Sequence, residues 1–161
     1  MLKLGKLTDY GTVLMTALAA DAAHPHSAQD LATRTRITVT TVAKLLKLLG
    51  KAGLVESIRG ARGGYRLARS PRDISVADIV AALEGPIALT QCSVHDGCSI
   101  EHHCGVRSNW RVINDAVRTA LTSVTLADMT APLQRTGAAP AEHPVRFAPR
   151  PIPPASPPGD A

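Results

Sequence analysis

The chain has 161 residues, which is enough for one domain of ordinary size with extensions, and for a core that needs no disulfide or metal. Only 2% of the residues are aromatic whereas 45% are hydrophobic, a composition that favours packed helices over an aromatic-rich β-sandwich or barrel. The net charge of +5 is uneven, because residues 1–72 contain 12 Lys and Arg against 4 Asp and Glu. Such a basic half favours a polyanionic partner, although a solvated basic face would have the same composition.

Two further features exclude classes of protein. No apolar stretch reaches the roughly 18 residues that a membrane-spanning helix needs, so no membrane partner is expected. The three cysteines are an odd number, which fits poorly with the disulfide framework of a secreted protein. We therefore expect a cytoplasmic protein.

Three helices are expected first along the chain. Apolar residues with helical spacing predict a helix over residues 8–23, and Pro25 disfavours its continuation. Ser27 offers a cap for a second, short helix, with an acidic residue three positions on. Thr38 can cap a third, "VTTVAKLLKLLGKA", with a buried stripe of Val42, Leu45, Leu46 and Leu49. This order predicts a helix-turn-helix.

A β-hairpin should follow. The segments "LVESI" and "YRLAR" have strand character and flank the glycine-rich basic turn "RGARGG". Glycines there let the backbone take positive φ and approach another surface closely. The expected fold class is therefore mainly α: a winged helix-turn-helix with a small hairpin as its wing.

The second half should contain more helix. Ser75 and Asp78 predict a capped helix that ends at Gly85, a loop with all three cysteines follows, and a long helix is predicted over Arg107–Ser123. The apolar seam of that helix could serve a partner helix or the core, and consists of Val106, Trp110, Ile113, Val117, Ala120 and Val124. The segment "TLAD" predicts a last helical turn.

We divide the chain into three parts. Residues 1–72 form the expected DNA-binding region, and residues 73–130 form a helix, the cysteine loop and the long helix. Residues 131–161 contain nine of the twelve prolines and should be disordered.

The first part has side chains suited to duplex DNA. Thr40, Thr41 and Lys44 lie on the free face of the third predicted helix, where they could meet base edges and phosphates of the major groove. Arg59 and Arg62 lie at the hairpin tip and suit the narrow, negative minor groove. A solvated helix face for the lysines is the alternative.

The cysteines are evenly spaced. Cys92, Cys98 and Cys104 are separated by five residues each, with His95, His102 and His103 among them. This spacing departs from the close Cys-x2-Cys pairs of most structural zinc sites, whereas thiolates on a wide loop can surround an iron–sulfur cluster. Zinc or a disulfide switch remain the alternatives.

Several segments together resemble a known family. A winged helix, a cysteine loop with two five-residue gaps and a Trp-containing helix, with "KLTDYG", "GLVESIRGARGGYRLAR" and "ISVADIVAALEG", resemble the IscR/NsrR family of iron–sulfur transcription regulators over about residues 1–130. Within it, "KLTDYG", "KLLKLL" and "EGPIALTQC" are most similar to regulators of the suf iron–sulfur assembly operon.

The resemblance implies a homodimer whose long dimerisation helices cross and present two winged helices to a pseudo-palindromic operator in double-stranded DNA. A [2Fe-2S] or [4Fe-4S] cluster would be the switch, with repression in the cluster-bound state. It also implies site residues. The three cysteines match the cluster ligands, Arg59 matches the wing arginine, and the recognition helix is matched by Thr38, Thr40, Thr41 and Lys44.

One position departs from the IscR branch. Where that branch has a histidine ligand three residues after the last cysteine, this chain has Arg107, which cannot ligate a metal. In the NsrR branch an aspartate from the other subunit takes this role, and Asp9 occupies the matching place. His95, His102 and His103 are the alternative ligands, and Asp9 could instead stabilise its helix through the macrodipole.

Two other functions are the alternatives to an iron–sulfur regulator. A thiol enzyme or redox carrier would need a low-pKa cysteine beside a base or a Cys-x2-Cys pair, and neither is evident, so we expect no enzyme. A regulator whose cysteines hold zinc, or form a disulfide or nitric oxide switch, is the second.

Overall fold

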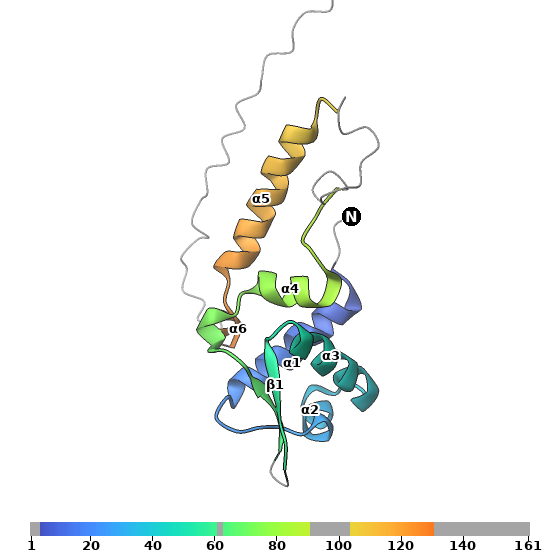
Figure 1. Ribbon diagram of the computed structural model, residues 1–161, viewed down its shortest axis with the longest axis vertical. Coiled ribbons are helices and arrows are strands. Elements are labelled where there is room, and N and C mark those ends of the chain that lie inside the picture. Colours follow the sequence, from blue (N-terminus) through green and yellow to red (C-terminus); the bar gives the residue numbers. More distant parts are fainter. Residues whose placement is uncertain (1–3, 61–62, 91–103, 131–161) are drawn as a thin grey trace, which may run out of the picture.

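The computed structural model describes residues 4–60, 63–90 and 104–130 of the chain. Three helices come first, namely α1 (Lys6–Ala20), α2 (Ala28–Thr35) and α3 (Val39–Lys51). A hairpin and further helices follow: β1 (Val55–Ile58), β2 (Gly64–Leu67), the 3-10 turn η1 (Pro71–Asp73), α4 (Val76–Glu84), α5 (Arg107–Ser123) and α6 (Leu126–Thr130). The predicted fold class, mainly α with a winged helix-turn-helix, a small hairpin and a long helix, is confirmed (Figure 1).

The core lies among α1, α2, α3, the hairpin, α4 and α6. Its largest side chains are at most 2% exposed, and include Leu14, Met15, Leu18, Leu31, Val42, Leu45, Leu46, Leu49 and Leu54. Burial of one such side chain contributes about 1.5–3 kcal/mol. The predicted buried stripe of α3 is therefore confirmed, and its opposite face is left for other contacts.

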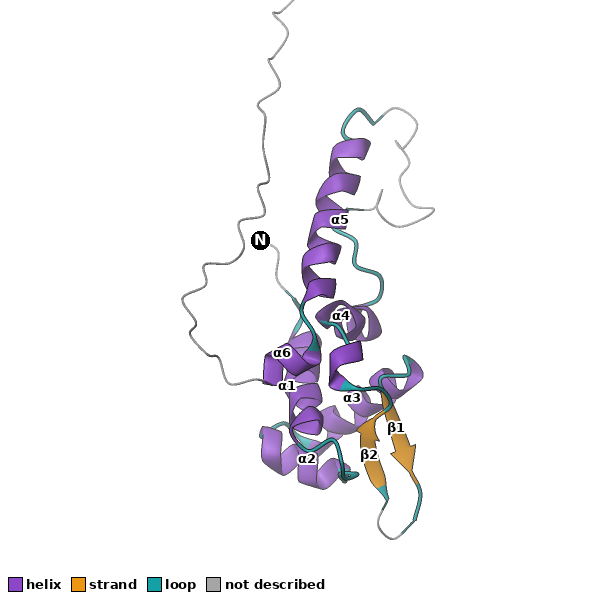
Figure 2. Cartoon of the chain, turned by 90° about the vertical axis from the view of Figure 1, so that its left-hand side faces the viewer, coloured by secondary structure: helices purple, strands orange, loops and turns teal. Residues whose placement is uncertain are grey.

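The hairpin has the predicted strands in an antiparallel register from Val55↔Leu67 to Ile58↔Gly64. At its turn the backbone approaches itself so closely that a Cβ on Gly63 would lie 2.3 Å from the carbonyl oxygen of Ile58. The glycine of this turn is required by that approach. In Figure 2 the hairpin lies beside the helices, at the end of the molecule opposite α5.

Two local predictions were wrong. The first helix begins at Lys6, because the N–H groups of Thr8 and Asp9 bond to the carbonyl oxygen of Gly5, and it ends at Ala20 rather than at residue 23. Thr38 is the N-cap residue of α3 by position, but its side chain makes no capping hydrogen bond. Its hydroxyl pairs instead with that of Thr41, 2.9 Å away.

The capping predictions for α2 and α4 are confirmed. Ser27 accepts a hydrogen bond from the N–H of Asp30 at 3.0 Å. Ser75 and Asp78 form a reciprocal capping box at the start of α4. Such boxes satisfy backbone N–H groups that a helix leaves without partners, and so fix where the helix begins.

Helix α5 extends away from the other helices, at the end of the molecule opposite the hairpin, with α4 at its base (Figures 1 and 2). Its only buried residue is Asn114, whose Oδ1 accepts a hydrogen bond from the N–H of Leu89 at 3.1 Å. Within the described ranges, no helix has the length and apolar character to cross a bilayer.

Candidate nucleic-acid interface and cysteine site

The first two turns of α3 present threonine and lysine side chains on one side. Thr38, Thr40 and Lys44 are exposed and Thr41 is half-buried, because the apolar residues of the helix face the core on the opposite side. Hydroxyl groups can donate to and accept from base edges and phosphates, and an ammonium group can bind phosphate. The structure thus brings four of the predicted DNA-binding residues together on one helix.

The cations near this side are not neutralised by carboxylates. In the described part of the chain, none of Lys44, Lys47, Lys51 and Arg59 forms an ion pair. Arg66 differs from them, because its Nε lies 2.6 Å from Glu56 Oε1 on the neighbouring strand. Unpaired cations on one side of a domain attract a polyanion without regard to its sequence.

Arg59 follows β1 directly, where the chain enters the turn of the hairpin, and it is exposed. Gly60 follows with a φ of 116°, a conformation that favours glycine. Arg62, the other arginine predicted at the hairpin tip, lies outside the described residues. The structure therefore presents Arg59 on the wing, away from the core.

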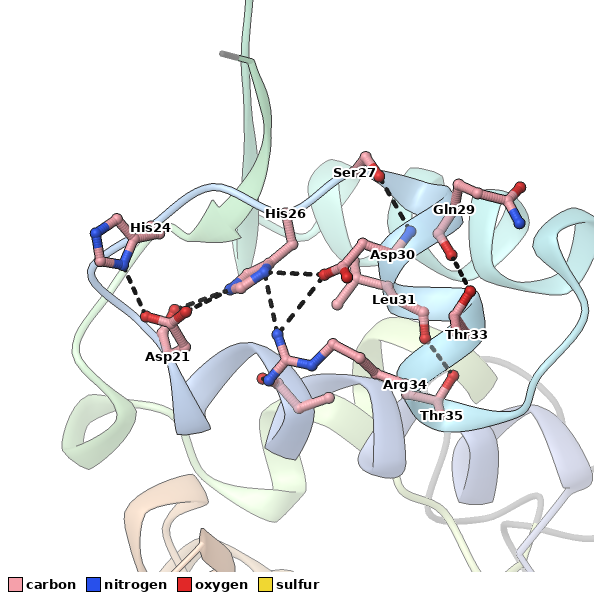
Figure 3. A network of polar contacts seen from close by, with 11 residues as sticks. Asp21, His24, His26, Ser27, Gln29, Asp30, Leu31, Thr33, Arg34 and Thr35 are labelled. Carbon is pink, nitrogen blue, oxygen red and sulfur yellow. Dashed lines mark hydrogen bonds and ion pairs between the residues drawn. The ribbon is translucent and has the colours of Figure 1, made fainter.

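A polar network that was not predicted joins the α1–α2 connection to α2 (Figure 3). His26, only 8% exposed, lies at its centre, between Asp21 on one side and Asp30 and Arg34 on the other. A hydrogen bond from the exposed ring of His24 lowers the pKa of the Asp21 carboxyl from its ordinary value of 3.8. The spacings of four residues from His26 to Asp30 and from Asp30 to Arg34 were the signals in the sequence.

The cysteine site is described in part. Cys104 is half-buried with a free thiol, and its carbonyl oxygen accepts a hydrogen bond from the N–H of Arg107, at the start of α5. Cys92 and Cys98 lie outside the described residues, and so do the alternative ligands His95, His102 and His103. Among the described residues, no group of three His, Cys, Asp or Glu could hold a metal ion.

Asp9 is exposed in the first turn of α1, and its carboxylate has no hydrogen bond or ion pair with a described residue. The start of α1 adjoins the end of α4 (Figure 1), where Glu84 accepts a hydrogen bond from the N–H of Gly5 at 2.6 Å and another from the hydroxyl of Thr8. After Glu84, Gly85 has a φ of 91° and the chain leaves the helix toward the cysteines. Asp9 therefore lies at the end of α1 that is nearer to the point where the chain leaves α4 toward the cysteines.

These donors suit iron in their chemistry. Thiolates are the usual ligands of iron–sulfur clusters, and a carboxylate is a harder oxygen donor that can complete such a set. Cys104 has a free thiol and Asp9 a carboxylate without a competing cation among the described residues. The guanidinium of Arg107 has no lone pair to offer, so it stays excluded as a ligand.

Comparison with known proteins agrees with the predicted fold and with transcriptional regulation. A family model described as "Rrf2: Iron-dependent Transcriptional regulator" matches residues 4–132. The HTH-type transcriptional regulator IscR of Aliivibrio salmonicida is 31% identical over 128 residues, which are 77% of this chain and 76% of the relative. Protein rrf2 of Nitratidesulfovibrio vulgaris is 36% identical over 130 residues, 80% of this chain and 87% of the relative.

Solved structures show the same fold. CymR, described as the global cysteine regulator of B. subtilis, has a TM-score of 0.64 and 35% identity, over 81% of this chain and 97% of that one. IscR of T. potens has a TM-score of 0.61 and 38% identity, over 80% and 85%. The oxidized form of Staphylococcus aureus CymR has a TM-score of 0.62 and 30% identity, over 82% and 98%. The relatives named as regulators agree with the prediction that the chain is not an enzyme.

Proposed function

The chain belongs to the Rrf2 family of transcriptional regulators, and from that premise we propose that it is a homodimeric repressor that binds a pseudo-palindromic operator and responds to a cysteine-ligated iron–sulfur cluster. The genes it controls would encode iron–sulfur cluster assembly, as the resemblance of "KLTDYG", "KLLKLL" and "EGPIALTQC" to suf regulators implies.

The unpaired basic residues on two adjacent elements are the main support for DNA binding. Lys44 and Lys47 on α3 and Arg59 on the wing are exposed and form no ion pair with a described residue. A helix in the major groove and a hairpin beside it in the minor groove place these cations against phosphates. Thr38, Thr40 and Thr41 would meet base edges, and Arg62 would extend the contact of the wing.

The apolar seam of α5 supports a homodimer. Four residues of this seam are 37–52% exposed and lie on one side of the helix, namely Val106, Trp110, Ile113 and Val124. Aligned apolar residues of this kind are costly in water and are buried when a second helix packs against them. Two copies of α5 that cross would hold two wings at a fixed separation, which a two-fold symmetric operator requires.

Cys92, Cys98 and Cys104 would hold the cluster, with Asp9 of the other protomer as the fourth ligand. When bound, the cluster would make the state of this site depend on iron and on redox conditions. The residues of the chain do the rest: Glu84 bonds to Gly5 and Thr8, so the segment that leads to the cysteines is tied to the first turn of α1. A change in that segment would reach α1, which packs against α2 and α3.

The test of DNA binding begins with selection of a duplex from a random pool, using protein purified without oxygen. Replacement of Arg59 by Ala should weaken binding to the selected operator and reduce the slope of log K against log salt by about one. Arg66→Ala is the matched control, because Arg66 is already paired with Glu56. Equal affinities for Arg59→Ala and the unmodified protein would remove the wing from the interface.

A second candidate is a regulator that uses its cysteines for zinc or for a disulfide or nitric oxide switch. Two observations favour it: Cys104 is a free thiol, and one similar structure is described as an oxidized form. Iron and sulfide measured per chain, with the visible absorption of an oxygen-free sample, separate the two candidates. A colourless protein with bound zinc would favour the second.

A further inference from the structure

We propose that His26 is a positioning residue that holds the wing against the helix-turn-helix, and that protonation of its ring strengthens this hold. The inference rests on the proposed function, because its readout is binding of the operator. Every group that it uses lies among the described residues.

The backbone of His26 extends the hairpin. Its N–H donates to the carbonyl oxygen of Tyr65 at 2.9 Å, and the N–H of Tyr65 donates to the carbonyl oxygen of His26 at 2.8 Å. The approach is so close that a Cβ on Gly64 would lie 2.6 Å from the His26 oxygen. Strand β2 is therefore paired with β1 on one side and with the α1–α2 connection on the other.

The surroundings of the ring fix one of its two protons. Among the described residues, Nε2 faces only oxygen atoms of Asp21, the carbonyl oxygen at 3.0 Å and Oδ2 at 3.7 Å. Both are acceptors, so Nε2 has a hydrogen in either protonation state of the ring. The side of the ring toward Asp21 is thus the same in both states.

Nδ1 has two competing partners (Figure 3). Arg34 Nη1 lies 3.1 Å from it and Asp30 Oδ2 lies 3.2 Å from it. A guanidinium only donates and a carboxylate only accepts, so one ring nitrogen cannot satisfy both at once. In the neutral ring Nδ1 accepts from Arg34. In the charged ring, after Nδ1 takes a proton from water, it donates to Asp30.

Arg34 has other partners when the ring is charged. Its Nη1 lies 3.7 Å from Asp30 Oδ2, and its Nη2 donates to the carbonyl oxygen of Ala17 at 3.4 Å. Hydrogen bonds between charged partners are about twice as strong as neutral ones, so the charged ring binds Asp21 and Asp30 more firmly. His24, also on the connection, and Tyr65 on β2 are the other titratable groups of this neighbourhood.

An α1–α2 connection that is bound more tightly by the charged ring should hold the wing more rigidly. The His26 backbone pairs with β2, and β2 pairs with β1, after which Arg59 follows directly. Binding to DNA requires the wing in one position, and any hold that exists before binding reduces the conformational cost of the complex. Operator affinity should therefore rise when the His26 ring gains its second proton.

The experiment measures the operator dissociation constant at about pH 6 and about pH 8. For the unmodified protein, affinity at the lower pH should be at least about fivefold higher, the low end of couplings between protein sites. His24→Gln is the matched control, because His24 is an exposed histidine on the same connection, and it should keep this ratio. His26→Gln should lose the ratio. A His26→Gln protein with the unmodified ratio would overturn the proposal.

Two further variants test the proposal if the His26→Gln protein does not fold correctly. Asp30→Asn changes an exposed residue and removes the anionic acceptor for Nδ1, so it too should lose the pH dependence, and retention would count against the proposal. In an Arg59→Ala background, His26→Gln should cause a smaller additional loss, because part of the wing contact through which His26 acts is then already absent. An equal additional loss would place its effect elsewhere. If the unmodified protein selected no duplex at either pH, the proposed function itself would fail, and this inference with it.

Discussion

Glu84, the last residue of α4, accepts a hydrogen bond from the N–H of Gly5, which is the N-cap of α1, at 2.6 Å. The same carboxylate oxygen accepts from the hydroxyl of Thr8, which is 1% exposed. One carboxylate at the end of α4 thus accepts two hydrogen bonds from the start of α1. Asp9 follows Thr8 in the sequence, and the segment that leads to the cysteines follows Glu84. The proposed aspartate ligand and the start of the cysteine segment therefore both lie next to this contact between α4 and α1.

Replacement of Glu84 by Ala tests this junction. The change leaves the N–H of Gly5 and the hydroxyl of Thr8 without their acceptor, and loss of such a helix cap costs about 0.5–2 kcal/mol of unfolding free energy. Urea unfolding followed by circular dichroism measures the loss. Glu56→Ala removes an exposed carboxylate that makes a surface ion pair, and should cost at most about 1 kcal/mol. Equal stability of Glu84→Ala and the unmodified protein would contradict the structural role of Glu84.

Replacement of Asp9 by Ala tests the fourth ligand. If Asp9 completes the cluster, the variant should lose its visible absorption faster in an oxygen-free sample, because a ligand is missing. Asp73→Ala is a suitable control, since Asp73 is an exposed aspartate in η1, away from α1 in sequence. A spectrum as durable as that of the unmodified protein would transfer the role to His95, His102 or His103.

The seam of α5 predicts the oligomeric state. A carboxylate placed in an interface between helices costs several kcal/mol when it has no partner, so Ile113→Asp should give monomers. Val112→Asp is the matched control, because Val112 is 69% exposed and lies outside the seam, and it should remain dimeric. Light scattering after size exclusion measures the mass, and circular dichroism checks the helix content. Dimers of Ile113→Asp would show that α5 is not the interface.

The start of α6 predicts a dependence of stability on pH. Thr125 donates through its hydroxyl at 2.6 Å and through its N–H at 2.8 Å to Asp128 Oδ2, and these bonds lower the pKa of that carboxyl from its ordinary value of 3.8. Because the folded state favours the ionised form, the stabilisation is complete above the ordinary pKa and is lost as the pH falls through the lower, folded value.

Unfolding in urea should therefore show a lower midpoint for Asp128→Ala than for the unmodified protein at neutral pH. The difference should narrow as the pH falls below 3.8, where the carboxyl of the unmodified protein begins to take up protons. A difference that is the same at neutral and at acid pH would mean that the charge of Asp128 contributes nothing.

The parts of the fold that depend on local patterns were predictable. The buried stripe of α3 and the capping box of Ser75 and Asp78 are set by residues a few positions apart, and the structure has both. The end of α1 was predicted too far along the chain, because contacts of the Asp21 side chain with His24 and His26 accompany the turn that follows this helix.

Contacts between distant segments were not predictable in this way. The bridge of His26 to Tyr65 and the bonds of Glu84 to the start of α1 depend on packing that no local pattern encodes. The residues proposed to bind DNA were predicted because exposure on α3 follows from helical periodicity. The proposed cysteine ligands rest on spacing and resemblance, since Cys92 and Cys98 lie outside the described residues.

In the proposed function, ligation at the three cysteines controls the affinity of the basic face for DNA. The dissociation constant of the selected operator tests this, measured by fluorescence anisotropy without oxygen, for the protein as purified and after removal of iron with a chelator. Removal of iron should weaken binding by at least about tenfold, within the range of couplings between protein sites. Equal affinity of the two forms would contradict it.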